Sequence, residues 1–320
     1  MNIGKPFWIV CSAALIAFVF VPPVGAQTWR LHQFPPNLVA DFSSSDDVVI
    51  EQTFEVWHRG PESAFFVTIS AGGSGDFEPR LAYNGSGDSV AYNLYDSAAQ
   101  DHILKDTTAN PSAGEVVSGS FPATAGQGGA WQRQSFTFAF VVPSTGGPEG
   151  SLAVAGEYTD TIVATLYQGT LGSYTATDQQ QTTGVAITVP PILDLEIVSS
   201  GGTFGTGGLE HAMNFGVLMP GAVRDADLLV RTNTVYNVAL RSANQGVLAF
   251  VGDDPTSFVP FNLSVDGNLI DLSPETDVTI AESAPPTAEA RYAIAVEIPD
   301  FGLPSEGEYE DVITVTVTAQ

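Results

Sequence analysis

Cysteine is almost missing from this chain, since Cys11 is the only one among 320 residues. Cys11 also lies in a segment with the features of a removable leader, so the mature protein would contain no cysteine. Disulfide scaffolds and metal sites with thiolate ligands are therefore excluded. A chain of this kind must be held together by side-chain packing and by hydrogen bonds between strands.

Long apolar runs are missing as well, apart from one near the N-terminus. Lys5 precedes an apolar run of 15 residues from Phe7 to Val21, and Val24-Gly-Ala26 provides the small residues of a cleavage site. A membrane-spanning helix needs about 20 apolar residues. Residues 1–26 are therefore predicted to be a signal peptide, and the mature chain would be exported from Gln27 onward.

Basic residues are scarce. The chain has 10 Lys and Arg against 36 Asp and Glu, and loss of Lys5 with the signal leaves 9 against 36, a net charge of −27. Such a charge repels nucleic acids and anionic lipids, so neither is expected as a partner. Only 14% of the residues are charged and 44% are apolar, which indicates a packed protein with an acidic surface.

Helical periodicity hardly occurs, whereas short β-branched and aromatic runs recur between clusters of Gly, Pro, Ser and Asp. This pattern predicts an all-β fold. The predicted strands are Val48 to Trp57, Phe65 to Ser70, Val90 to Tyr95, Ser135 to Val142, Thr159 to Tyr167, Val185 to Val189, Leu193 to Val198, Ala226 to Arg231, Tyr236 to Arg241, Val259 to Val265, Arg291 to Ile298 and Asp311 to Thr318.

Two segments nearly repeat one another: Gly156-Glu-Tyr-Thr-Asp160 and Gly307-Glu-Tyr-Glu-Asp311. Three earlier segments also have counterparts in the same order, at offsets of 171, 169 and 156, followed by 151 for this motif. Matching order with drifting spacing indicates two homologous domains with different loops. The three pairs begin at Ala64 and Val235, at Val90 and Val259, and at Phe138 and Ile294.

The boundary between the two repeats is predicted at Pro190-Pro191, because two prolines form a stiff, extended connection. The N-terminal domain would comprise residues 27–190 and the C-terminal domain residues 191–320. Short strands at this spacing are typical of β-sandwiches.

The two repeats differ beyond their shared strand. After the first copy comes a further strand-like run, Thr183 to Val189, whereas after the second only a few residues remain, up to Gln320. The C-terminal sandwich is therefore expected to lack its last strand and to need a partner that provides it.

Some segments resemble catalytic or metal sites, but simple turns explain them better. Gly73-Ser-Gly75 and Gly85-Ser-Gly-Asp-Ser89 resemble nucleophile turns, but no helix follows either one. The acid pairs Asp46-Asp47 and Asp253-Asp254 lack the spacing of a calcium loop, and a pair of glycosidase carboxylates is not identifiable from sequence. We expect β-turns at these segments, and no enzyme activity, catalytic residue, cofactor or metal.

Three apolar side chains in glycine-rich loops are candidates for contact with a ligand. Trp131 follows Gly126-Gln-Gly-Gly-Ala130, while Leu171 and Tyr174 lie between the Gly-Glu-Tyr strand and the added strand. Such residues are either packed back onto the sandwich or offered to a partner, and the sequence favours neither alternative.

Several motifs resemble the spore coat U domain family, whose members are subunits of archaic chaperone–usher pili. The C-terminal half has the closer resemblance, and the N-terminal half shares fewer motifs. The segments concerned are Phe215 to Gly221, Leu229 to Leu240, Val259 to Leu263 and Gly307 to Val317, together with Val90 to Tyr95 and Ala155 to Asp160.

The resemblance implies two immunoglobulin-like sandwiches, of which the second is completed by a donated strand. Its partners would be a periplasmic chaperone, an outer-membrane usher and the N-terminal strand of a neighbouring pilin. Family members often have cysteines near the start of the domain, which this chain lacks. The expected acceptor groove comprises Leu195, Ile197, Ile313, Val315 and Val317.

The N-terminal segment is predicted to be a poor donor, because Pro35-Pro36 interrupts residues 27–42 and proline cannot donate to a β-ladder. A protein that accepts a strand without donating one belongs at the pilus tip. The expected function is thus adhesion to an unknown surface ligand, after transit through the periplasm to the cell surface. The alternatives are a non-adhesive structural or initiator subunit and a secreted β-sandwich hydrolase.

Overall fold

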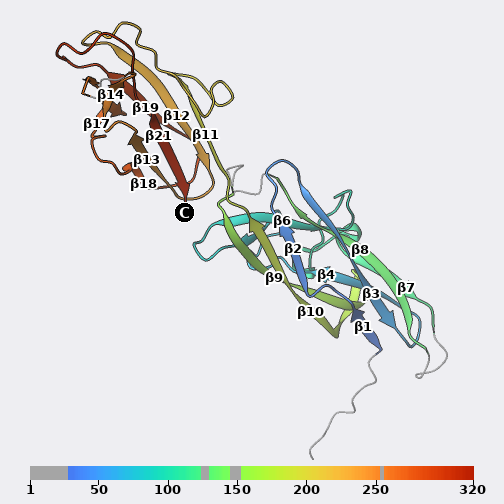
Figure 1. Cartoon of the computed structure of the whole chain (residues 1–320). Helices are drawn as coiled ribbons and strands as arrows, with labels where there is room; N and C mark the ends of the chain where they lie inside the picture. Colours follow the sequence, from blue (N-terminus) through green and yellow to red (C-terminus); the bar gives the residue numbers. More distant parts are fainter. Residues whose placement is uncertain (1–27, 124–129, 145–152, 253–255) are drawn as a thin grey trace, which may run out of the picture.

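The computed structural model describes residues 28–123, 130–144, 153–252 and 256–320. In these ranges the chain forms two β-sandwiches that lie end to end (Figure 1). The predicted signal peptide, with Cys11, lies outside the described residues. None of the helices in the described ranges has the length and apolar character needed to cross a membrane.

The N-terminal sandwich contains β1 to β10 and two short 3-10 helices. One sheet has the order β1-β3-β8-β6 and the other β7-β4-β9-β10-β2, and β5 joins them by pairing with β6 and β9. Only β10 and β2 run parallel. The elements are β1 (Trp29–His32), β2 (Asn37–Asp41), β3 (Val48–His58), β4 (Ser63–Ile69), β5 (Arg80–Tyr83), β6 (Ser89–Tyr95), η1 (Thr107–Ala109), η2 (Ala113–Glu115), β7 (Val117–Phe121), β8 (Gln132–Val142), β9 (Gly156–Thr170) and β10 (Ser173–Val189).

The C-terminal sandwich contains β11 to β21. Its sheets have the orders β11-β12-β19-β16-β17 and β18-β13-β21, and a small third sheet has the order β15-β14-β20. The elements are β11 (Leu193–Ser199), β12 (Val223–Thr232), β13 (Tyr236–Ser242), β14 (Val247–Phe250), β15 (Phe258–Pro260), β16 (Asn262–Val265), β17 (Asn268–Ile270), β18 (Val278–Ala284), β19 (Thr287–Glu297), β20 (Tyr309–Glu310) and β21 (Ile313–Ala319).

The two sandwiches correspond strand by strand up to one edge. The repeated strand is β9 in the first sandwich and β21 in the second. β9 is followed in its sheet by β4 and then β7, and β21 is followed in the same way by β13 and then β18. On its other side β9 pairs with β10, and β10 with β2, whereas no strand of the described residues fills these positions beside β21. The predicted fold class is confirmed: two immunoglobulin-like sandwiches, the second lacking its last strand.

A tyrosine in the repeated motif makes the same hydrogen bond in both sandwiches. The hydroxyl of Tyr158 donates to the carbonyl of Val154, and that of Tyr309 to the carbonyl of Ser305, each at 2.7 Å. A tyrosine that bonds back to the chain just upstream, at the start of the penultimate strand, is a hallmark of immunoglobulin-like sandwiches. It fixes how the chain enters β9 and β21.

The aspartate of the motif anchors a second loop in both sandwiches. Asp160 accepts a hydrogen bond from the amide of Gly73 (2.8 Å), and Asp311 accepts one from the amide of Asn244 (2.9 Å). Gly73 and Asn244 are 171 positions apart, the offset that relates β4 to β13. Burial, and then a 2.6 Å hydrogen bond to Asp160, raises the pKa of Tyr92 well above its usual value, so Tyr92 acts as a neutral donor.

The prolines of the N-terminal segment mark a switch between sheets. β1, before Pro35-Pro36, pairs antiparallel with β3 in one sheet, and β2, after them, pairs parallel with β10 in the other. The carbonyl of Pro35 accepts from the Thr183 hydroxyl (2.7 Å), and that of Pro36 from the Gly184 amide (3.0 Å). The segment is therefore used within its own sandwich.

Several predicted strands differ in extent from the observed ones, and for two of them the structure shows the reason. Residues 259–265 form two strands, because β15 ends at Pro260, which has no N–H to continue the ladder, and β16 then pairs with a different sheet. The run from Thr183 to Val189 is only the last part of the 17-residue β10. The polar first part of β10 does not alternate in hydropathy, and its pairing with β9 alone makes it a strand.

Asn233, between β12 and β13, connects the two sandwiches. Its side-chain amide donates to the carbonyls of Ala153 (3.1 Å) and Pro190 (3.0 Å), and its side-chain oxygen accepts from the amide of Ile192 (2.8 Å). Its backbone carbonyl accepts from the amide of Ala155 (2.9 Å). Asn233 is almost fully buried, so it holds the diproline connection against both sandwiches.

We expect residues 27–190 to fold on their own, because β10 already covers the core beside β9. Ile187 is fully buried in β10, so Ile187→Asp should destabilise this fragment by several kcal/mol through a buried, unpaired charge. Thr182→Asp is the matched control, since Thr182 is exposed on the same strand. Urea unfolding followed by circular dichroism measures both changes. An unfolded wild-type fragment would contradict the prediction.

Candidate functional site: the open edge of the C-terminal sandwich

The free edge of β21 is the main candidate site. β21 pairs along its whole length with β13, and within the described part of the chain no other strand pairs with it. Its backbone groups on the other side are thus available for hydrogen bonds with an added strand. An edge of this kind is a template for a further strand and a hazard for aggregation.

The side chains at this edge are only partly covered. Ile162, Ala164 and Leu166 of β9 are fully buried, whereas their counterparts Ile313, Val315 and Val317 of β21 are half-buried. Among the described residues the same contrast holds for the two cores: the N-terminal core has 26 buried and 6 partly buried apolar residues, and the C-terminal core has 13 and 19. The C-terminal core is open along this edge.

The five residues predicted to line the acceptor groove all pack against the C-terminal core. Leu195 and Ile197 on β11, and Ile313, Val315 and Val317 on β21, are all partly buried and belong to one apolar cluster. β11 lies in one sheet and β21 in the other, so the two sets flank the open core from opposite layers. This arrangement fits the predicted acceptor groove.

One part of the groove was missed from the sequence. In the N-terminal sandwich, β2 directly precedes Phe42, and the matching Phe215 is preceded by residues 210–214, which form no strand. Both phenylalanines pack against their own cores. β2 pairs with β10. The described residues contain no strand equivalent to β10 beside β21, so residues 210–214 have no strand to pair with. The shared Phe, a few residues before β3 and before β12, could have revealed the match.

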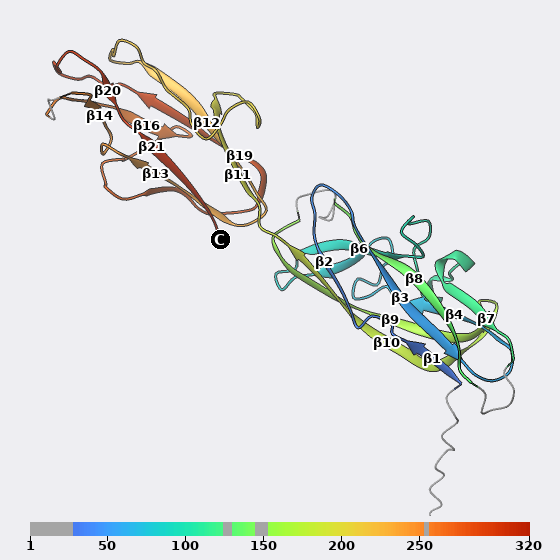
Figure 2. The same cartoon turned by 45° about the vertical axis from the view of Figure 1, so that its right-hand side comes forward.

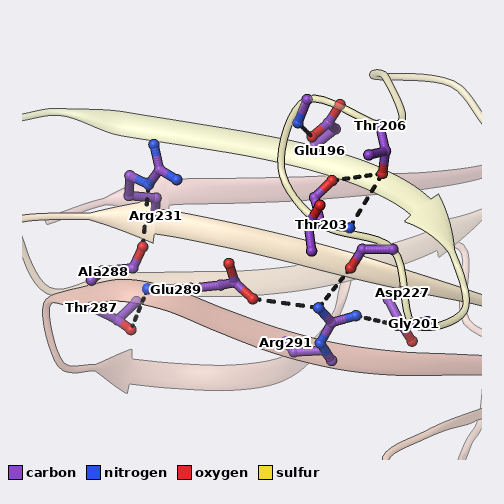
Figure 3. A network of polar contacts seen from close by, with 12 residues as sticks. Glu196, Gly201, Thr203, Thr206, Asp227, Arg231, Thr287, Ala288, Glu289 and Arg291 are labelled. Atoms are coloured by element: carbon purple, nitrogen blue, oxygen red, sulfur yellow. Dashed lines mark hydrogen bonds and ion pairs between the residues drawn. The ribbon is translucent and has the colours of Figure 1, made fainter.

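The loop just before that segment is fixed by polar contacts (Figure 3). Asp227 forms an ion pair with Arg291 and accepts a hydrogen bond from an amide of loop residues 200–208 at 2.8 Å. Arg291 also donates to a carbonyl of this loop (2.7 Å), and Glu196 accepts from two of its amides (2.6 and 2.8 Å). These contacts hold one rim of the groove against β11, β12 and β19.

The three predicted ligand contacts lie at the end of the N-terminal sandwich that carries β1 and the turn between β9 and β10, away from the other sandwich (Figures 1 and 2). Trp131 is half-buried, with the guanidinium groups of Arg30 and Arg59 over its ring. Leu171 is half-buried in the two-residue turn, and Tyr174 is 44% exposed.

Tyr174 also packs back onto its own sandwich. Its ring makes edge contacts with Phe66 (5.3 Å) and Tyr167 (5.2 Å). Trp131 is 6.3 Å from the ring of Trp57. The three candidates therefore share one end of the molecule, in two separate groups.

The segments that resembled catalytic or metal sites form turns. Ser74 donates to the carbonyls of Ala71 and Asp76, and the ring of His102 contacts Asp96. In the ranges that the structure describes, no group of three or more His, Cys, Asp or Glu could hold a metal ion. Asp47 accepts from the amide of Ser144; Asp253 and Asp254 lie outside these ranges.

Residues 42–165 match the Spore Coat Protein U domain family. The matched residues all lie in the N-terminal sandwich. The sequence motifs had suggested a closer resemblance in the C-terminal half, which the match does not include. None of the curated proteins matches the chain.

Several solved structures are similar to this chain. One is the complex of the chaperone CsuC with the tip adhesion subunit CsuE from archaic Csu pili of Acinetobacter baumannii, at 13% identity over 88% of this chain and 97% of that chain, with a TM-score of 0.40. A second is CfaE, the adhesive subunit of CFA/I fimbria of enterotoxigenic Escherichia coli, at 10% identity over 89% of this chain and 92% of that chain, with a TM-score of 0.36. A third is the CooA pilin subunit of the same organism, at 14% identity over 51% of this chain and 99% of that chain, with a TM-score of 0.34.

An added strand should close the open edge. We expect a copy of residues 182–189, joined after Gln320 through a two-residue turn, to stabilise the C-terminal sandwich, because Val185, Ile187 and Val189 would then lie opposite Val317, Val315 and Ile313 and would each bury apolar surface worth about 1.5–3 kcal/mol. The control is the same extension with these three residues changed to Ser. Thermal and urea unfolding of the mature chain measures the gain, and equal stability of the two extensions would contradict an open groove.

Proposed function

We propose that this protein is the tip subunit of a chaperone–usher pilus and that it mediates adhesion. Residues 27–190 would form the adhesive domain, and residues 191–320 a pilin domain completed by a donated strand. The observation that carries the proposal is the difference between the two sheets. β10 lies beside β9, whereas the matching position beside β21 has no strand in the described residues.

The N-terminal sandwich provides a template for the missing strand. β10 runs antiparallel to β9 and directs Thr183, Val185, Ile187 and Val189 into the core at alternate positions. A donor to the C-terminal sandwich would run antiparallel to β21 and carry a similar row of apolar side chains. Main-chain bonds would give it affinity, and side-chain pockets specificity. A periplasmic chaperone would provide the strand first, and the neighbouring pilin after passage through the usher.

The position at the tip follows from the N-terminal segment. β1 and β2 are paired within their own sandwich, so residues 29–41 are not available to complete another subunit. A subunit that accepts a strand and donates none ends the fibre. Its place would then be the outer end of a pilus on the cell surface.

A non-adhesive structural or initiator subunit is the alternative. The packing of Tyr174 against Phe66 and Tyr167, and the partial burial of Leu171, favour this alternative at the hairpin. The exposed 44% of Tyr174 favours adhesion. Attachment assays separate the two functions.

Assembly should depend on the inward face of β21. We expect Ile313→Asp with Val315→Asp to abolish the complex with the chaperone, because the charges would enter the apolar groove. Thr314→Asp with Thr316→Asp is the control, since both threonines are exposed on the outer face of the same strand. Co-purification of the mature chain with its chaperone from the periplasm measures complex formation. A stable wild-type monomer without a chaperone would refute strand donation.

Adhesion should depend on the distal end of the N-terminal sandwich. We expect Trp131→Ser, Leu171→Ser and Tyr174→Ser together to reduce attachment of piliated cells to polystyrene at least tenfold, through loss of apolar contact area multiplied over many pili. Val39→Ser with Tyr83→Ser is the control, because both residues are exposed elsewhere on this sandwich.

Cells retained after washing are counted, and pili are counted by electron microscopy. If attachment survives the triple change, other loops make the contact with the surface. Attachment that survives loss of the whole protein, with pili present, would end the adhesive proposal.

A further inference from the structure

Arginine and tryptophan side chains gather at the distal end of the N-terminal sandwich. Arg30 on β1, Trp57 on β3 and Arg133 on β8 are directly opposite one another across three neighbouring strands. Arg59, just after β3, and Trp131, just before β8, extend this row. We call these five residues the arginine–tryptophan cluster.

Two guanidinium groups of the cluster face the same ring. The Cζ atoms of Arg30 and Arg59 lie 4.4 and 4.7 Å from the centroid of the Trp131 ring. The two cations are thus at most about 9 Å apart, close to the screening length of about 8 Å at physiological ionic strength. Each guanidinium group is attracted to the ring, and the two cations repel each other. An anion placed between them would be stabilised by both.

The cluster gathers most of the positive charge of this sandwich. Residues 27–190 contain five Lys and Arg against 17 Asp and Glu. Arg80 is fully buried and donates to the carbonyls of Ser70, Ile69 and Leu104, while Lys105 forms ion pairs with two glutamates. The other three cations are Arg30, Arg59 and Arg133. Arg30 and Arg133 therefore give this otherwise acidic sandwich exposed positive charge at its distal end.

The cluster also offers aromatic surface. Trp57 and Trp131 are both partly exposed, and Arg30 and Arg133 are exposed on either side of Trp57. One carboxylate, that of Glu55, adjoins the cluster and accepts a 2.7 Å hydrogen bond from the indole N–H of Trp57. This bond orients Trp57, and His32 covers part of the same ring at 4.4 Å.

We propose that the arginine–tryptophan cluster binds an acidic polysaccharide. Sugar rings would pack against the exposed part of Trp57, and the carboxylate or sulfate groups of the polymer would pair with the guanidinium groups, which bind such oxyanions through two parallel hydrogen bonds. The inference rests on the adhesive role proposed above and names its ligand class.

The charge distribution favours this polymer over nucleic acid. Duplex DNA carries a negative charge about every 1.7 Å along its axis, and the acidic surface around the cluster would repel most of those charges. Polygalacturonate carries a single carboxylate on each sugar unit, so its charges are spaced more widely than those of duplex DNA. Its charges can therefore meet the three arginines while neutral parts of the polymer cross the remaining surface.

Attachment of piliated cells to polygalacturonate, dextran sulfate and neutral dextran tests the proposal. We expect wild-type cells to bind the two acidic polymers in a salt-dependent manner and not neutral dextran. Arg30→Gln with Arg133→Gln should reduce this binding at least tenfold at 0.15 M salt. Both side chains are exposed, so folding and piliation should persist. Arg241→Gln is the control for loss of an exposed cation on the other sandwich.

The conservative pair Arg30→Lys with Arg133→Lys should restore binding in part and make it more sensitive to salt, because lysine keeps the charge but not the paired hydrogen bonds. A preference for dextran sulfate would assign sulfate as the anion, and a preference for polygalacturonate would assign carboxylate.

Equal binding of acidic polymers by the Gln variant and the wild type would overturn the proposal, as would equal binding of neutral dextran. If attachment to polystyrene still depends on this protein, the adhesive function stands and only the ligand class fails. If piliated cells that lack the protein attach equally well to every surface, adhesion itself fails.

Discussion

The pairing of the Gly-Glu-Tyr strand with a further strand is the interaction on which both sandwiches depend. β9 pairs with β4 and β5 and, on its other side, with β10, whose apolar face covers the core beside it. β21 has one neighbour, and the side chains on its inner face remain half-buried. A β-sandwich with one strand missing loses main-chain hydrogen bonds and core coverage together. The two halves of the chain differ mainly in this respect.

The hydrogen bonds that fix the chain around the Gly-Glu-Tyr strand are the same in both sandwiches. Tyr158 and Tyr309 make equivalent bonds to the chain upstream, and Asp160 and Asp311 anchor equivalent loops. The C-terminal sandwich therefore makes these hydrogen bonds without the added strand, and loop residues 200–208 are held by their own polar contacts. A strand entering this site would meet a largely preformed groove, which reduces the entropy cost of binding.

The roles proposed for the two sandwiches rest on their completeness. The first closes its own core, so its distal end, with the arginine–tryptophan cluster, can serve as a rigid recognition surface. The second would serve as the joint to the fibre. Asn233 bonds to the chain of the first sandwich, to the diproline connection and to residues that begin the second. Force on the joint would thus reach the distal sandwich through a short, buried contact.

Much of the fold could be predicted from the sequence, because alternating hydropathy and the repeated motif are local signals. They revealed the all-β class, most of the strands, the repeat and the apolar row at Ile313, Val315 and Val317. Pairing between distant segments decided the rest. Residues 210–214 match β2 but form no strand, since their partner is absent, and Arg30 and Arg59 reach Trp131 only because β1, β3 and β8 are neighbours in one sheet. No local pattern in the sequence encodes such contacts, which arise when the sheets form.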